Sequence, residues 1–203
     1  MTDMLLRILG GLILLAVLVI AFFAWTLRPL DMDAVSQQWM TEQDRFVTVD
    51  GEDWRVRESG PEDAPALVLI HGFSHSLEAW DAMAAELEAD HRIIRFDLPG
   101  HGLTGPRADQ AYSVPETVSQ VSALLDVIAP DSFAIGGNSL GGLVAWRYAA
   151  GHPDRVTDLI LIDPSGYPNL GVADDPAPVP DAVRAYLSLA PEAGVAYATS
   201  TLY

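Results

Sequence analysis

The sequence predicts an α/β fold in which a mostly parallel sheet is covered by helices on both faces, preceded by an N-terminal transmembrane helix. Short segments that are apolar throughout alternate with longer segments whose apolar residues recur at helical spacing. This alternation is typical of parallel strands that are buried on both sides. Ahead of it, residues 8–27 run without a single charge. The length of 203 residues fits one globular domain beside that helix.

The apolar segment at residues 8–27 is long enough to cross a bilayer. At about 1.5 Å per residue it spans roughly 30 Å, the thickness of the hydrocarbon core. Arg7 and Arg28 bracket the segment, and Trp25 lies near its end, where interfacial aromatic residues are favoured. We therefore expect residues 1–28 to form an uncleaved single-pass anchor that contacts the lipid bilayer.

Two alternatives to an anchor are a cleaved signal peptide and a buried helix. A signal peptide usually has a shorter apolar region followed by a small-x-small cleavage site, whereas this segment ends in the letters AFFAW. A buried helix of a soluble domain is seldom apolar all round. Arg7 and the amino terminus slightly outweigh Arg28, which Asp31 and Asp33 follow. This balance favours the N-terminus inside and the soluble part outside the cytoplasm.

A linker and a hairpin are expected to open the soluble part. Residues 29–41 are interpreted as a linker, with a short helix as the alternative form. The stretches RFVTVDG and DWRVRESG are typical of two strands joined around Asp50 and Gly51.

Strands and helices then alternate as far as residue 163. The predicted strands are residues 66–70, 92–96, 132–137 and 156–163. The predicted helices are one carrying Leu77, Trp80, Ala84 and Leu87, and those at residues 114–128 and 140–150. From Pro168 the sequence is rich in Pro, Asp and Gly, which is typical of a loop. The alternation does not resume before Tyr203, so we expect the chain to be incomplete at its C-terminus.

The composition excludes several classes of function. The 28 acidic residues outnumber 11 basic ones and give a net charge of −17, which repels phosphate backbones and argues against nucleic-acid binding. There is no cysteine, which excludes disulfides, thiol catalysis and cysteine-based metal sites. Histidines and carboxylates do not follow a metal-ligand spacing, so we predict neither a metal nor another cofactor.

One serine lies in a sequence motif that is typical of catalytic nucleophiles. Residues 137–141, Gly-Asn-Ser-Leu-Gly, match G-x-S-x-G between a predicted strand and a predicted helix. In that context a tight turn holds the serine hydroxyl clear of the sheet as a nucleophile. Leu140 begins the helix, so its N–H is aimed at an oxyanion that forms on the substrate. A glycine-rich turn with an incidental serine is the plainer alternative, and a phosphate-binding turn lacks the required G-x-G-x-x-G spacing.

Three further stretches strengthen this interpretation. His71-Gly72-Phe73 ends one predicted strand, RFDLPGHG spans residues 95–102, and YAAGHPDRVTDLILID follows the serine. With the serine motif they resemble the α/β-hydrolase fold superfamily, in family order and over about half of the chain. The resembling group includes esterases, perhydrolases and carbon–carbon bond hydrolases. The resemblance implies that Ser139 is the nucleophile and that the N–H of Phe73 joins that of Leu140 in an oxyanion hole.

The resemblance also implies structural roles for other polar residues. His71 and His101 are expected to shape loops through hydrogen bonds to the backbone rather than to transfer protons. Asp97 is expected to fix the loop at residues 99–102. His152 is expected at a helix C-terminus, where an imidazole is favourable.

The activating groups of the serine are not evident. In the resembling family an acid and then a histidine follow the serine, whereas only His152 follows Ser139 here. About a dozen residues of helix put His152 roughly 20 Å away. Asp163 ends the next strand and is a candidate acid, although an N-cap or turn role is the expected one. We therefore expect the 203 residues alone to be inactive.

These observations together predict a membrane-anchored serine hydrolase that acts on a carboxylic ester or similar small acyl substrate. Residues 42–167 would be the N-terminal part of the hydrolase core, and residues 168–203 the start of its lid. A carbon–carbon bond hydrolase of the same fold is the alternative chemistry. A non-catalytic scaffold, or a fragment of a larger enzyme, is the alternative from a different class.

Overall fold

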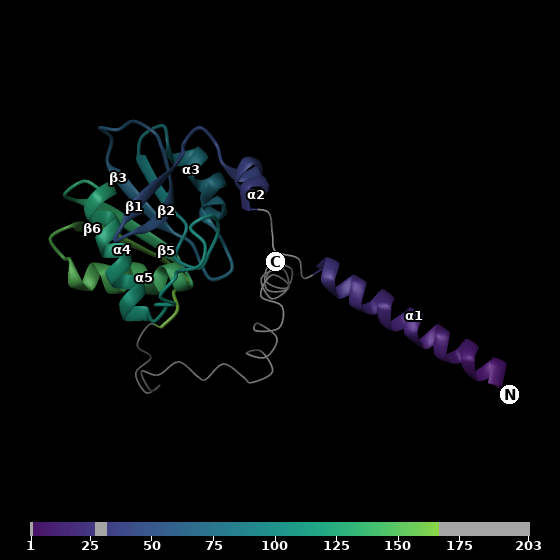
Figure 1. Cartoon of the computed structure of the whole chain (residues 1–203). Coiled ribbons are helices and arrows are strands. Elements are labelled where there is room, and N and C mark those ends of the chain that lie inside the picture. Colours follow the sequence, from purple (N-terminus) through teal and green to yellow (C-terminus); the bar gives the residue numbers. More distant parts are fainter. Residues whose placement is uncertain (1, 27–31, 167–203) are drawn as a thin grey trace.

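A six-stranded mixed sheet organises the chain between residues 44 and 162. The computed structural model describes residues 2–26 and 32–166 (Figure 1). The strands are β1 (Asp44–Val49), β2 (Glu52–Ser59), β3 (Ala66–Ile70), β4 (Arg92–Phe96), β5 (Phe133–Asn138) and β6 (Val156–Ile162). Their order in the sheet is β1-β2-β4-β3-β5-β6. The predicted α/β fold is thus confirmed, and each predicted strand lies within a residue or two of its expected bounds.

The first two strands form the expected hairpin. β1 pairs antiparallel with β2, and β2 pairs antiparallel with β4, whereas β4, β3, β5 and β6 run parallel to one another. Asp50 and Gly51 connect the hairpin with φ angles of 53° and 80°. Positive φ at both central residues is what a two-residue turn needs to match the twist of its strands.

Helices cover both faces of the central strands. η1 (Leu77–Trp80) and α3 (Asp81–Leu87) pack on one face, where Trp80 and Ala84 join a buried cluster with Leu67, Leu69 and Ile93. α4 (Val114–Ile128) and α5 (Leu140–Gly151) pack on the other face, against alternate residues of β3 and β4. The single helix expected around Leu77 is therefore a 3₁₀ turn followed by an α-helix.

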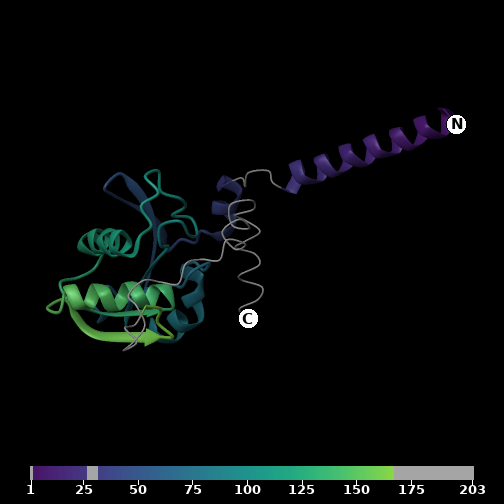
Figure 2. The same cartoon turned by 90° about the horizontal axis from the view of Figure 1, so that it is seen from below.

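β6 departs from the expectation that helices cover every strand. It is the last described strand of the sheet, and Figure 2 draws it along the outer margin of the folded part. Leu159, Ile160 and Ile162 are 42%, 42% and 36% exposed. The apolar run that predicted a buried strand therefore marks an open margin of the described sheet.

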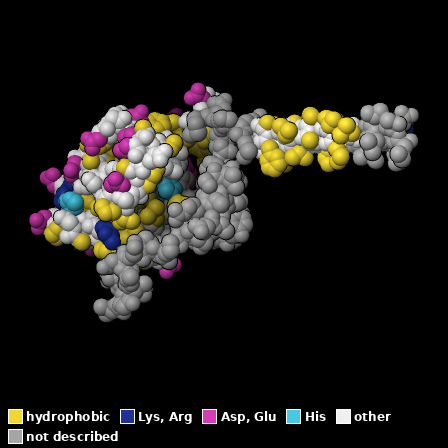
Figure 3. Space-filling model, turned by 60° about the horizontal axis from the view of Figure 1, so that its bottom comes forward, with side chains coloured by type: hydrophobic (Ala, Val, Ile, Leu, Met, Phe, Trp, Pro, Cys, Tyr) yellow, Lys and Arg dark blue, Asp and Glu magenta, His cyan; other side chains and the backbone are white. Residues whose placement is uncertain are grey.

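The apolar segment forms α1 (Thr2–Thr26), and α2 (Met32–Trp39) follows it. The stretch Leu9–Thr26 has a mean hydropathy of 2.5, and none of it is buried (Figure 3). Its length and composition suit a membrane span, and a signal sequence near an N-terminus has the same features. The described residues thus contain an exposed apolar helix that could serve as a membrane anchor or as a signal sequence.

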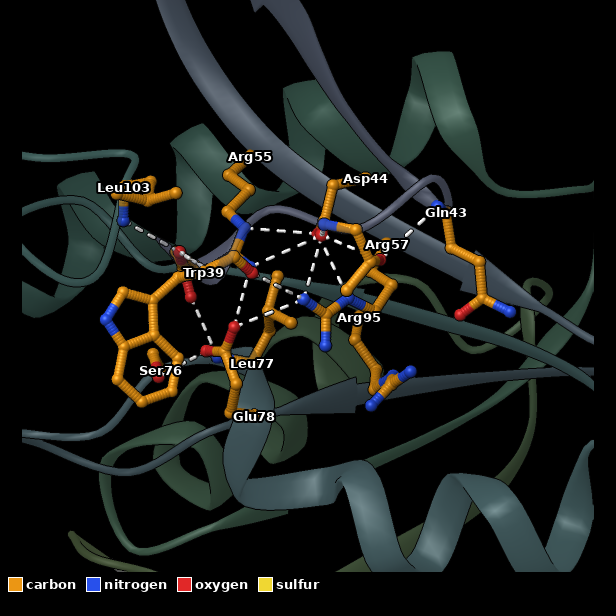
Figure 4. A network of polar contacts seen from close by, with 12 residues as sticks. Trp39, Gln43, Asp44, Arg55, Arg57, Ser76, Leu77, Glu78, Arg95 and Leu103 are labelled. Atoms are coloured by element: carbon orange, nitrogen blue, oxygen red, sulfur yellow. Dashed lines mark hydrogen bonds and ion pairs between the residues drawn. The ribbon is translucent and has the colours of Figure 1, made fainter. Parts of the chain in front are cut away.

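A buried network of ion pairs joins the hairpin to α2 and η1 (Figure 4). Arg55 and Arg57, both on β2, share the carboxylate of Asp44, with N···O distances of 3.1 and 2.8 Å. Glu78 of η1 lies 2.6 Å from Arg55 and 3.2 Å from Arg57. Both arginines also donate to the Trp39 carbonyl at the end of α2. Each buried arginine thus lies beside a carboxylate, which offsets the cost of burying its charge. Removing one partner would leave a buried charge unpaired.

Acid unfolding of this network is our first prediction. Burial on its own would raise the pKa of Asp44, but hydrogen bonds from Arg57, the Thr41 N–H and Arg55 lower it from 3.8 to about 2. A depressed carboxyl pKa stabilises the fold above the unfolded-state pKa, and that stability is lost as the pH falls towards 2. We expect Asp44→Asn to lower the free energy of unfolding at pH 6. The difference from wild type should shrink by on the order of 2 kcal/mol between pH 5 and pH 2.

Urea unfolding at a series of pH values, followed by tryptophan fluorescence, measures this difference. The matched control is Asp63→Asn, in the exposed loop between β2 and β3, for which we expect little change at any pH. A deficit in Asp44→Asn that stays constant down to pH 2 would contradict the assignment.

Candidate active site

Ser139 lies at a sharp turn between β5 and α5. Its φ and ψ angles are 50° and −114°, in a region that non-glycine residues rarely adopt. Its N–H donates to the Ile162 carbonyl at 3.1 Å, and its carbonyl accepts from the N–H groups of Leu143 at 3.0 Å and Ser165 at 2.9 Å. β6, the segment after it and α5 therefore hold the turn through backbone hydrogen bonds.

The glycines of the motif allow the turn to pack closely. A Cβ atom at Gly137 would overlap the backbone of Gly141, and a Cβ at Gly141 would overlap the carbonyl of Ile70 at the end of β3. A Cβ at Gly142 would come within 2.8 Å of Pro164. The spacing of the motif thus reflects contacts of α5 with β5, β3 and the segment after β6.

The two predicted oxyanion donors border one cleft. Leu140 is the first residue of α5, so its N–H has no acceptor within the helix. Phe73 lies in the loop that follows β3 and is 53% exposed. Both residues line a cleft of about 510 Å³. Gly72 brings this loop onto the turn, since a Cβ there would lie 2.9 Å from Asn138 Oδ1.

His71 and Asp97 hold loops, as predicted. The ring of His71 is fully buried: Nε2 accepts from the Leu98 N–H at 2.9 Å, and Nδ1 lies 2.8 Å from the Gly72 carbonyl. Burial lowers the pKa of His71 to about 3, so its imidazole is neutral near pH 7. Asp97 accepts from the Leu77 and Leu103 N–H groups at 2.7 and 2.9 Å.

His101 and His152 also have the expected backbone contacts. His101 Nδ1 lies 3.0 Å from the Pro99 carbonyl, and burial lowers its pKa. His152 follows the last residue of α5, where its Nδ1 lies 2.9 Å from the Tyr148 carbonyl and its Nε2 lies 3.2 Å from Ser122 Oγ. None of these hydrogen bonds reaches Ser139, so both rings have the structural contacts that were expected of them.

The segment after β6 supplies a neighbour that sequence reasoning did not identify. Ser165 Oγ lies 3.3 Å from Ser139 Oγ, in the described part of the chain. Asp163, the candidate acid, is exposed and has a φ angle of 43° directly after β6. The sequence signal for Ser165 was only its place in the turn after this strand.

His75 is a second residue near the turn to which sequence reasoning assigned no role. It is half-buried and lines a small cavity of about 170 Å³ together with His71, Gly72 and Asn138. No sequence pattern separated it from a surface histidine. His91 is likewise half-buried.

Comparison with known proteins agrees with this geometry. The family model described as the alpha/beta hydrolase fold matches residues 65–194. The chain belongs to the alpha/beta hydrolase fold family. Within that family it is 38% identical over 109 residues to the pimeloyl-[acyl-carrier protein] methyl ester esterase of Edwardsiella ictaluri, covering 54% of this chain and 39% of that protein.

Other hydrolases of the family are similar to the same region. Over 108 residues the chain is 34% identical to the monoacylglycerol lipase abhd6-B of Xenopus laevis, covering 52% of this chain and 32% of the lipase. A solved bacterial membrane phospholipase A superimposes with a TM-score of 0.61 and 29% identity over 82% of this chain and 54% of that one. The chain spans less than half the length of the curated relatives that it matches.

A pair of glycine substitutions tests the close packing of the turn. Gly141→Ala should destabilise the fold by several kcal/mol, because its Cβ would overlap the Ile70 carbonyl and overpacking typically costs about 1–3 kcal/mol or more. Gly151→Ala, at the other end of α5, meets no atom within 4 Å. It should be neutral or stabilise the helix by up to about 1 kcal/mol. Urea unfolding of both variants measures the contrast, and equal effects would contradict the packing described here.

Proposed function

We propose that the protein is an esterase-like or lipase-like serine hydrolase in which Ser139 attacks the carbonyl carbon of a carboxylic ester. The observation that carries this proposal is the strained turn at Ser139 beside a cleft lined by both Phe73 and Leu140. The esterases and lipases among the relatives support the same class of reaction.

The backbone is proposed to stabilise the charge that develops in the reaction. Attack on an ester carbonyl turns its oxygen into an oxyanion, which N–H donors at about 2.7–3.1 Å stabilise. We assign these donors to Leu140, whose N–H begins α5, and to Phe73, whose loop rests on Asn138 through Gly72. Removing one such donor typically costs about a hundredfold or more in kcat.

A base has to accept the proton of Ser139 during the attack. The hydrogen bonds of His71, His101 and His152 run to other groups than Ser139, so we do not assign the base to them. We place the base outside the described residues. Asp163, directly after β6, stays a candidate for the acid that would orient it, with a turn role as its alternative. The comparisons give no support to the expectation that the 203 residues are inactive.

We further propose that α1 anchors the hydrolase in a membrane. Residues 1–28 would be a single-pass anchor, and residues 29–41, which include α2, would link it to the core. Residues 42–167 would form the N-terminal part of the core, and residues 168–203 the start of a lid. The stretch Leu9–Thr26 of α1 carries no charge and none of it is buried, which supports an anchor. The N-terminus inside and the hydrolase outside the cytoplasm is the orientation that the flanking charges favour.

Activity-based labelling tests the proposed nucleophile. A fluorophosphonate probe, applied to membranes of cells that express the protein, should form a covalent adduct that maps to Ser139, because such probes react with activated serines. Ser139→Ala should abolish the labelling.

Ser165→Ala is the matched control, since its hydroxyl lies 3.3 Å from that of Ser139. We expect this variant to retain labelling, at a rate no more than about tenfold below wild type. An adduct on Ser165, or the absence of any adduct on the folded protein, would overturn the proposal.

A further inference from the structure

The cleft beside Ser139 has an almost entirely apolar lining. Its walls come from the loop after β3, the loop after β4 and the first turns of α4 and α5. Among the described residues that line it there is no Arg, Lys, Asp or Glu. We propose that this cleft binds the hydrocarbon chain of an uncharged acyl ester, an inference that rests on the proposed function and names its substrate class.

Two aromatic side chains shape the cleft. Tyr112 is 43% exposed, and its ring packs beside Gly100, where a Cβ would lie 3.1 Å from Tyr112 Cε1. The Tyr112 hydroxyl accepts from the Arg107 N–H at 2.6 Å, which fixes the ring. Phe73 packs edge-on against His101, with ring centroids 5.6 Å apart. Both rings therefore offer hydrocarbon surface beside an open cleft, as ligand sites commonly do.

The polar side chains of the lining do not offer a charge. Thr117 is buried at 9% exposure, and His101 Nδ1 is engaged with the Pro99 carbonyl. Burial lowers the pKa of His101, so its ring is neutral near pH 7. The guanidinium of Arg107, next to this wall, is paired with Asp109 at 2.8 Å. Apart from the proposed oxyanion donors at its border, the described lining therefore offers no cation to a charged group, and burying such a group without a partner is unfavourable.

The rest of the molecule reinforces this preference for an uncharged ligand. The net charge is −17. Acidic groups are scattered over the face drawn in Figure 3, and few basic groups are visible among them. Such a field repels carboxylates and phosphates and leaves a neutral ester unaffected. Charge complementarity thus favours the ester over the free fatty acid that its hydrolysis releases.

The volume sets the size of the chain. A cleft of about 510 Å³ holds at most about 17 non-hydrogen atoms, because a water molecule, which has one such atom, takes about 30 Å³ of liquid. This corresponds to a medium-length acyl chain. With the chain in the cleft, the ester carbonyl would lie towards Leu140 and Phe73, the proposed oxyanion donors that border the cleft.

Photoaffinity labelling tests the inference without turnover. The probe is the methyl ester of decanoic acid with a diazirine at the end of the chain, applied to full-length Ser139→Ala protein in lipid nanodiscs. We expect the crosslinks outside α1 to map to residues 99–117, and methyl decanoate to compete with them. The free-acid form of the probe should crosslink there at least about tenfold more weakly, a difference of about 1.4 kcal/mol or more, because the described lining holds no cation for its carboxylate and the net charge of −17 repels it.

Two variants on α4 provide the matched comparison. Val114→Asp puts a carboxylate into the lining at the start of α4, where the helix dipole tolerates it, and should lower the crosslink yield at least about tenfold. Val127→Asp makes the same change on the same helix at a position that is 62% exposed and does not line the cleft. It should leave the yield within about twofold of the parent.

Several results would overturn the inference. They are crosslinks confined to α1, equal labelling by the free acid, an equal loss in Val127→Asp, or a cleft that takes no probe. Because the binding assay uses Ser139→Ala, it is independent of the fluorophosphonate result. Crosslinking without fluorophosphonate labelling would refute the proposed reaction and support the binding site. Fluorophosphonate labelling without crosslinking would refute only the binding site.

Discussion

One buried carboxylate holds both loops that border the candidate site. Asp97 is inaccessible to solvent, and its two oxygens accept from the Leu77 and Leu103 N–H groups, which belong to the segments after β3 and β4. Arg55 lies 3.4 Å from the same carboxylate and extends the contact to Asp44 and to the end of α2. The cleft and the loop that carries Phe73 therefore depend on charges that originate in the first hairpin. Because these groups are buried, the loss of one would lower the free energy of unfolding and would also disturb the loops at the site.

The turn at Ser139 combines strain with close packing. A non-glycine residue in its conformation costs on the order of 1–3 kcal/mol, and backbone hydrogen bonds to Ile162, Leu143 and Ser165 offset that cost. In return the hydroxyl stands free of the helix, and the N–H of Leu140 is left without a helical acceptor. The positions of the proposed nucleophile and of a proposed oxyanion donor thus both follow from this one turn, whose flanking glycines allow its close packing.

Much of the fold could be predicted from the sequence because its signals are local. The apolar run at residues 66–70 and the spacing at residues 114–128 define a strand and a helix without reference to the rest of the chain. The exposure of β6 was not predictable, since burial depends on what covers a strand. The Arg55 network escaped prediction because its acidic partners come from separate elements. The motifs located Ser139, but no motif of the sequence marks a histidine as the base that the proposed reaction needs.

A crystal structure of the protein after reaction with a phosphonate ester tests the central claim most directly. The account predicts phosphorus bonded to Ser139 Oγ, with the phosphoryl oxygen about 2.7–3.1 Å from the backbone nitrogens of both Phe73 and Leu140. Its alkyl group should lie in the cleft bordered by Tyr112. An adduct on another residue, or a phosphoryl oxygen that contacts neither nitrogen, would contradict the account.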